Sequence, residues 1–250
     1  MRISSTNLVF EKVFPVHRLD HRTSGALLLA FKSEMAAKLH AALREGDKEY
    51  IALLRGVWRF GDNETIVVDK PLRVDGVLKN ATTIFECIGT IEGDGLLNQE
   101  IYSGNADEVN TVPACTIVRA KPLTGRNHQI RRHAYNMSMP ILGDSEHGDS
   151  RANRFWRNKF GLNRLALHCF SLRLDLQANS EVSCGGNDRK IDSREKVDIL
   201  APIPEDLEEV FKRKELSTLW MKALQKEPRL AVERYDYRGG TFGRKSSHAD

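Results

Sequence analysis

The chain has 250 residues, enough for one or two globular domains, and its 40% hydrophobic and 29% charged residues argue against a fibrous protein. The longest apolar runs fall far short of the roughly 20 residues that cross a bilayer, which excludes a membrane-spanning helix as an interpretation. The four cysteines are widely separated and lack the Cys-x-x-Cys spacing of zinc sites. We therefore expect reduced thiols and an intracellular protein, cytoplasmic in the simplest case, with an organelle left open.

The first predicted element lies next to a nine-residue motif at residues 17–25, His-Arg-Leu-Asp-His-Arg-Thr-Ser-Gly. An apolar run follows at residues 26–31 and predicts a buried strand. Such a strand would hold the loop that carries Asp20, and a charged group on a rigid loop is typical of a catalytic site.

Downstream, Ser33 is placed to cap a helix that runs to about residue 44, with Gly46 as its stop. A strand is expected over residues 50–54. Residues 57–113 are rich in Gly, Asn and Asp between short β-branched runs, a composition that predicts strands joined by long loops.

Residues 115–120 are another strand candidate, and Thr124 is placed to cap the helix that follows. Ile130, Ala134 and Met137 would form the apolar face of that helix because they lie three and four positions apart. The pattern therefore predicts a strand followed at once by an amphipathic helix.

The last third of the chain predicts a long strand over residues 165–174, a polar turn over residues 179–193, and a helical region that opens at Pro204. These elements complete one catalytic domain over residues 1–227. Residues 228–250 are basic and contain Gly and Ser, which predicts a disordered tail.

Three motifs follow one another along the chain: residues 17–25, Lys-Glu-Tyr-Ile-Ala at 48–52, and Thr-Gly-Arg-Asn-His-Gln-Ile-Arg at 124–131, the last followed by Pro-Ile-Leu-Gly-Asp at 140–144. Together they resemble the signature segments of the RluA-type pseudouridine synthases, which re-attach uracil in RNA through carbon. Residues 143–154 are most similar to the TruC-type tRNA enzymes of that family. The resemblance implies an α+β fold with a mixed, mostly antiparallel sheet flanked by helices.

The resemblance also implies three catalytic residues. Asp20 would be the nucleophile, a role that needs neither cofactor nor metal. Arg131 would keep Asp20 ionised in a water-poor pocket, where burial alone raises the pKa of a carboxyl group. Tyr50 would pack on the uracil ring and help to remove the proton from C5.

Four further residues are implied in substrate binding. A base inside a helix is out of reach, so the target nucleotide must be flipped out, and Arg18 would fill the space it leaves. Ile130 would line the second face of the uracil ring. Arg126 and His128, from the same motif, would contact the substrate.

The charge distribution agrees with a polyanionic partner. Residues 109–174 hold eleven Lys or Arg against three Asp or Glu, a formal charge of +8 in a chain whose total is +4. We expect an RNA partner, with tRNA favoured and rRNA as the alternative, no membrane partner and a monomeric chain.

Several other interpretations compete with catalysis. Taken alone, Asp20 would be a turn residue that caps nearby amides. A non-catalytic RNA-binding protein would use the same cations, although a fixed carboxylate would repel the RNA backbone. A base hydrolase could use the same acid, whereas a kinase is excluded because a glycine-rich loop and an Asp-Phe-Gly motif are missing. A metal site is not expected, because His128 and His133 would not share a helix face and no ligand set is completed.

The beginning of the chain differs from the family pattern. Only sixteen residues precede His17, where family members normally carry an Asn-Lys-Pro-x-Gly stretch and a strand of the central sheet. A cleavable leader does not fit there either, because its removal would cut into the motif. We therefore expect a shortened N-terminal strand region, and the alternative function is an inactive RNA-binding relative.

Overall fold

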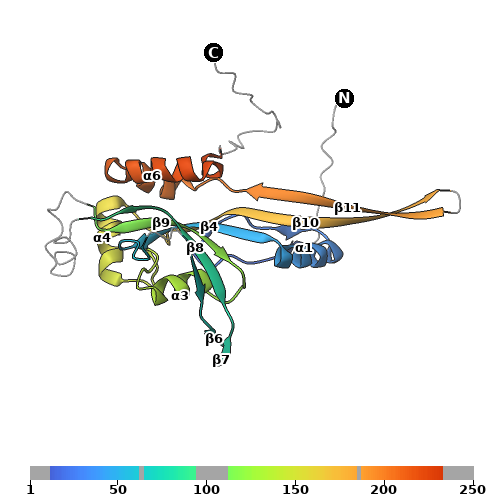
Figure 1. Ribbon diagram of the computed structural model, residues 1–250, viewed down its shortest axis with the longest axis horizontal. Helices are drawn as coiled ribbons and strands as arrows, with labels where there is room; N and C mark the ends of the chain where they lie inside the picture. Colours follow the sequence, from blue (N-terminus) through green and yellow to red (C-terminus); the bar gives the residue numbers. More distant parts are fainter. Residues whose placement is uncertain (1–11, 62–64, 94–111, 185–186, 233–250) are drawn as a thin grey trace, which may run out of the picture.

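A computed structural model describes residues 12–61, 65–93, 112–184 and 187–232. These residues form an α+β fold in which helices cover a mixed, mostly antiparallel sheet (Figure 1). The fold class predicted from the sequence is confirmed.

The main sheet has seven strands. Six of them follow one path of antiparallel neighbours, in the order β11 (Asn187–Leu200), β10 (Leu167–Cys184), β4 (Asp47–Arg55), β9 (Cys115–Pro122), β8 (Thr82–Ile91) and β5 (Thr65–Asp69). The two-residue β2 (Ser24–Gly25) pairs in parallel with β10. Two small ribbons complete the strands: β1 (Phe14–Pro15) with β3 (Leu29–Ala30), and β6 (Leu72–Val74) with β7 (Val77–Lys79).

Helices lie on both faces of this sheet (Figure 1). α6 (Lys214–Lys226) covers one face, whereas α1 (Ser33–Glu45) and α3 (Gln129–Asn136) lie on the other. The remaining helical segments are α4 (Ser150–Phe160), α5 (Glu205–Lys212) and the 3-10 helix η2 (Pro228–Ala231). Because helices cover the centre of the sheet on both faces, β4 carries a continuous run of buried apolar residues instead of an alternating pattern.

The strands expected around residues 50–54, 115–120 and 165–174 are present, within β4, β9 and β10. The buried strand expected over residues 26–31 is wrong. Only Leu29 and Ala30 are in strand conformation, and about half of the Leu29 side chain is exposed. The physical reason is that β3 pairs with β1 alone, so among the residues that the structure describes one face of this small ribbon, with Leu29, stays exposed.

Both predicted helix caps also differ from the structure. α1 begins at Ser33 itself, whose hydroxyl donates to Glu34 Oε1 at 3.0 Å, so Ser33 is the first helical residue rather than the cap. α3 begins only at Gln129, and its cap position is His128 in the left-handed region at φ 51°. Thr124 donates instead to the Gln129 side chain. In both places the expected capping side chain makes a different side-chain contact, Ser33 within the helix and Thr124 with the first residue of α3.

The polar turn expected over residues 179–193 is wrong, because β10 and β11 continue as a long hairpin through this region, with Asn179 paired to Asp192. The last helical region is divided at Arg213 into α5 and α6. The disordered tail predicted from residue 228 is wrong for residues 228–231, because they form η2 and Leu230 is buried in the core. Residues 233–250 lie outside the described residues.

Candidate active site

A cavity of about 700 Å³ opens where the three sequence motifs meet. Its walls come from the loop at residues 17–25, from the start of β4, and from the segment between β9 and α3. Asp20, Tyr50 and Ile130 all line it, although they are far apart in the sequence. The fold therefore brings the motif residues to one place.

The loop that carries Asp20 is tightly bent. The backbone N–H of Thr23 donates to the Asp20 carbonyl at 2.9 Å, and Arg22 between them adopts φ 69°. Gly25 closes the loop at φ 127°, where a Cβ atom would lie 2.2 Å from the Cys169 carbonyl oxygen. Only glycine fits this close approach to β10, which explains the glycine at the end of the motif.

His168 anchors the same loop to the sheet. Ser24 Oγ lies 2.7 Å from His168 Nδ1, and His168 Nε2 lies 3.1 Å from the Ala201 carbonyl oxygen. A carbonyl can only accept, so Nε2 carries the proton and Nδ1 accepts from Ser24. Burial lowers the pKa of His168 to about 4, so the imidazole is neutral at pH 7 and this tautomer persists.

Arg131, which is not among the residues that line the cavity, connects the loop to Asp144. Its Nη1 lies 3.8 Å from Asp20 Oδ2. The other guanidinium nitrogens are held by Asp144, with Nε at 2.8 Å and Nη2 at 2.7 Å from the two carboxylate oxygens. The bidentate pair fixes the guanidinium plane and leaves Nη1 directed at Asp20.

Asp144 is the supporting residue that the sequence prediction missed. Its side chain is fully buried and also accepts from the backbone N–H groups of Glu146 and His147. Burial, the largest single influence, raises the pKa of Asp144, but the hydrogen bonds from Arg131 and from the backbone of His147 and Glu146, with the charge of Arg131, together hold the pKa below its usual value. The sequence did contain a signal for Asp144. A buried arginine needs a carboxylate partner, and Asp144 is the first acidic residue after the acid-free residues 109–143.

Tyr50 lies in β4 at the wall of the cavity. Burial, and to a lesser degree the neighbouring Cys169 and Asp20, raise the pKa of Tyr50 well above its ordinary value. The phenol is therefore neutral at pH 7. It can stack and donate a hydrogen bond, but it is not a standing phenolate base.

Gln129 joins the start of α3 to the sheet. Its side-chain oxygen accepts from Thr124 Oγ1 at 2.6 Å and from the backbone N–H of Arg126 at 3.0 Å. Its amide nitrogen donates to the Thr82 carbonyl and to Thr83 Oγ1, both at 2.9 Å. All four contacts of this buried amide hold the cavity-lining turn in place, a role that the sequence prediction did not assign.

Comparison with known proteins gives the family. Residues 4–136 match the family model described as RNA pseudouridylate synthase, which is more than half of the chain. The chain belongs to the RNA pseudouridylate synthase family.

Two kinds of curated relatives of this family member are similar over about two thirds of the chain. Ribosomal large subunit pseudouridine synthase C of Haemophilus influenzae is 38% identical over 66% of this chain and 48% of its own length. tRNA pseudouridine synthase C of Vibrio parahaemolyticus is 34% identical over 65% of this chain and 66% of its own length. The chain thus spans about half to two thirds of the length of these relatives.

Two solved structures share the fold of the family. One is the human protein named RNA Pseudouridylate Synthase Domain Containing 4, with a TM-score of 0.54 and 21% sequence identity. The match covers 83% of this chain and 77% of the human chain. Human RNA pseudouridylate synthase domain containing 1 has a TM-score of 0.50 at 23% identity and covers 74% of this chain and 70% of its own.

In this member of the family, the cavity also gathers most of the residues predicted to bind substrate. Arg18, Arg126 and Ile130 line it, whereas His128 is not among the lining residues. Arg44 and Lys48, which the sequence prediction did not name, add two more cations to the walls. Among the lining residues that the structure describes, Asp20 is the one acid. No helix of the described residues is long and apolar enough to span a membrane.

Proposed function

We propose that this protein isomerises uridine to pseudouridine in structured RNA, with Asp20 as the nucleophile. The observation that carries the proposal is the single carboxylate of Asp20 in a cavity whose other charged groups are cationic. A phosphate-binding surface gains nothing from a fixed carboxylate, because the carboxylate repels the RNA backbone. A nucleophile explains its presence.

The reaction exchanges one bond for another without gain or loss of atoms. The bond between uracil N1 and the ribose C1′ breaks, the ring turns, and a bond forms between C5 and C1′. The proton on C5 leaves and N1 gains one. Asp20 holds the intermediate covalently between these steps and is released at the end, so no redox partner is required.

Arg131 acts through Asp20 in this scheme. Its Nη1, 3.8 Å from Asp20 Oδ2, places a positive charge beside the carboxylate that attacks. The side chain of Asp20 is 23% exposed toward the cavity, so its oxygens remain accessible to a substrate. Arg131 is therefore a positioning residue, while Asp20 makes the bond.

Tyr50 and Ile130 form two walls around the uracil ring in the proposal. Tyr50 contributes its ring face and a neutral hydroxyl, because burial raises its pKa. It assists removal of the C5 proton by hydrogen bonding and not as a phenolate.

The substrate nucleotide leaves its helix to enter the cavity, which has the volume of a site for a single small molecule. Arg18, exposed at the rim, takes the vacated place in the RNA. We favour tRNA, on the likeness of residues 143–154 to the TruC-type enzymes. Curated relatives of both the rRNA and the tRNA kind support an RNA substrate.

The test is release of tritium from C5-labelled uridine in bulk tRNA and, in parallel, in bulk rRNA. The wild-type chain is compared with Asp20→Ala, and Asp175→Asn is the matched control because Asp175 is an exposed carboxylate on β10 outside the cavity. We expect release from tRNA with wild type and control, and none with Asp20→Ala.

Product analysis separates the alternatives. Pseudouridine in the RNA supports the isomerase, whereas free uracil would identify a base hydrolase. A folded wild-type chain that binds both RNAs but releases no tritium from either would refute the proposal and leave an RNA-binding relative.

A further inference from the structure

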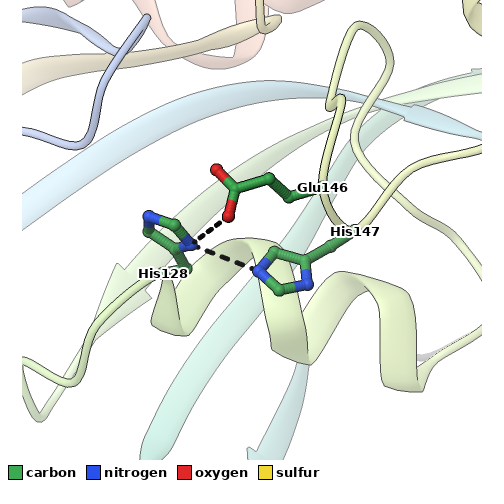
Figure 2. Close-up of side chains that lie close together, drawn as sticks. All are labelled: His128, Glu146 and His147. Atoms are coloured by element: carbon green, nitrogen blue, oxygen red, sulfur yellow. Dashed lines mark hydrogen bonds and ion pairs between the residues drawn. The ribbon is translucent and has the colours of Figure 1, made fainter.

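Beside the cavity, three potential metal ligands converge from two separate segments. His128 stands at the cap position of α3, and Glu146 and His147 belong to the segment between α3 and α4 that contains Asp144 (Figure 2). One ligand atom from each residue lies within 4.8 Å of the other two. The sequence predicted no metal site because His128 and His133 would not lie on the same face of a helix. In the structure His128 instead contacts His147.

We propose that His128, Glu146 and His147 bind a divalent transition-metal ion of the zinc class, with water completing the coordination. His128 Nδ1 lies 3.2 Å from His147 Nε2 and 3.5 Å from Glu146 Oε2. Zn²⁺ bonds of roughly 2.0–2.1 Å in a tetrahedral arrangement place neighbouring ligand atoms about 3.3 Å apart. Two of the three separations thus already match a common central ion.

The ligand types select the class of metal. Two imidazoles and one carboxylate suit Zn²⁺ and its neighbours in the first transition row, whereas Mg²⁺ and Ca²⁺ prefer oxygen ligands alone. Three protein ligands leave at least one position open in a tetrahedral site. Such a site accepts water or an oxygen of a bound molecule.

The backbone under the ligands is held in place before any ion binds. Asp144 Oδ1 accepts from the N–H of Glu146 at 2.9 Å and of His147 at 3.0 Å. Asp144 is itself fixed by Arg131, and His128 is set by its left-handed backbone at φ 51°. Glu146 is 56% exposed, so its side chain can rotate to close the remaining ligand separation.

The local charge also favours a dication. Asp20, Asp144 and Glu146 all pair with the single guanidinium of Arg131, and three negative charges against one positive charge leave a formal charge of −2. An ion of charge +2 balances this group of residues.

Glu146 connects the metal site to the cavity. Its Oε1 lies 3.2 Å from Arg131 Nη2, while its Oε2 faces His128. A bound metal would therefore share the Glu146 carboxylate with Arg131, each through a different oxygen. The ion would reach Asp20 only through Arg131, so the metal site is separate from the reacting atoms.

The experiment is a calorimetric titration of Zn²⁺ into the full chain after treatment with a chelator. His147→Gln and His128→Gln each remove one ligand, and Glu146→Gln removes the carboxylate while keeping its shape. His21→Gln is the matched control, because His21 is an exposed histidine outside the cluster. Thermal unfolding of each variant verifies that the chain is folded.

We expect one Zn²⁺ per chain in wild type and control. Loss of partners that merely support a ligand weakens metal binding about 10–100-fold, so each ligand variant should lose at least about tenfold in affinity. Equal affinity in wild type and His147→Gln would overturn the proposal.

A second readout uses the wild-type chain alone, so that it does not depend on the folding of a variant. Co²⁺ in a tetrahedral site of nitrogen and oxygen ligands absorbs visible light strongly, whereas Co²⁺ in water absorbs weakly. Strong bands that saturate at one Co²⁺ per chain and disappear on addition of Zn²⁺ support the site. A spectrum identical to that of Co²⁺ in buffer would overturn it.

Discussion

Two arginines of this protein each face three carboxylates, but the two clusters differ in their charge balance. Arg131 faces Asp20, Asp144 and Glu146. Arg119, on β9, faces another trio of acids: Glu49, Glu86 and Glu227. In both clusters the carboxylates raise the pKa of the arginine even though burial opposes this, so a perturbed pKa alone does not identify the functional cluster.

The Arg119 cluster is balanced by further cations. Arg229 lies 2.8 Å from Glu49 and 2.6 Å from Glu227, and Arg173 lies 3.3 Å from Glu49. Three arginines therefore meet three glutamates, with Arg173 also reaching the partly exposed Asp198 at 3.5 Å. None of these residues lines the cavity.

The Arg131 cluster has one cation for three acids, and one of these acids, Asp20, faces the cavity. An excess of carboxylates costs stability, because like charges repel one another. Its presence therefore points to a role other than stability. The comparison teaches that the Arg119 cluster, in which arginines and glutamates balance, stabilises the fold away from the cavity. The Arg131 cluster, in which carboxylates exceed cations, contributes Asp20 to the cavity.

The largest effect should follow Arg131→Gln. This change leaves Asp144 buried without its cation, and breaking a buried pair costs about 3–5 kcal/mol in free energy of unfolding. Loss of a preorganised charge at the site should also lower the proposed activity about 10²-fold or more. Urea unfolding and tritium release measure the two effects. Arg131→Lys is the control for charge, and full activity in Arg131→Gln would contradict the account.

A somewhat smaller effect is expected from pH, through the histidine that anchors the Asp20 loop. The pKa of His168 is about 4 in the folded chain against an ordinary value of 6.5. The stability that its neutral form contributes is therefore complete above pH 6.5 and is lost as the pH falls toward 4. The shift corresponds to at most about 3 kcal/mol. Urea unfolding of wild type and His168→Gln at pH 7 and pH 4 tests it, and parallel losses in both proteins would disprove this cause.

Arg119→Gln should separate the two clusters. We expect a loss of about 1–3 kcal/mol in free energy of unfolding, because Glu86 and Glu227 lose hydrogen bonds while Arg229 still pairs with Glu227. Activity per folded molecule should stay at the wild-type level, since Arg119 is not among the residues that line the cavity. A loss of activity as large as that of Arg131→Gln would break the distinction between the clusters.

The smallest effect is expected for Arg126→Ala, which removes a rim cation that belongs to neither cluster. One phosphate contact fewer should weaken RNA binding uniformly and reduce the slope of log affinity against log salt by about 0.7–0.9. Lys222→Ala on the exposed side of α6 is the control. Filter binding at several salt concentrations measures the slope, and an unchanged slope would show that Arg126 does not touch phosphate.

Much of the site could be predicted from the sequence because its residues sit in three contiguous motifs. The motifs name Asp20, Tyr50 and Arg131, and the structure brings all three to one region. Asp144 and Gln129 were missed as supports, because their value lies in contacts across the fold and not in local spacing. His128 was predicted to bind substrate, but its left-handed backbone directs it toward His147 and away from the cavity.

The fold was predictable where local patterns agree with the packing. The apolar run at residues 50–54 identifies β4 because this strand is covered on both faces. The β10–β11 hairpin was not predictable, since residues 179–193 contain few apolar residues and their strand state comes from pairing with each other. The helix caps were wrong for a different reason, because Thr124 contacts the Gln129 side chain and Ser33 contacts Glu34, so neither hydroxyl accepts from the first turn of its helix.

The central claim, that Asp20 makes the bond, is tested most directly by nucleoside analysis of RNA after incubation with Asp20→Asn. Asparagine keeps the shape of the side chain but removes the charge, so RNA binding and folding should remain while no pseudouridine forms. Pseudouridine produced by Asp20→Asn at the wild-type rate would contradict the account.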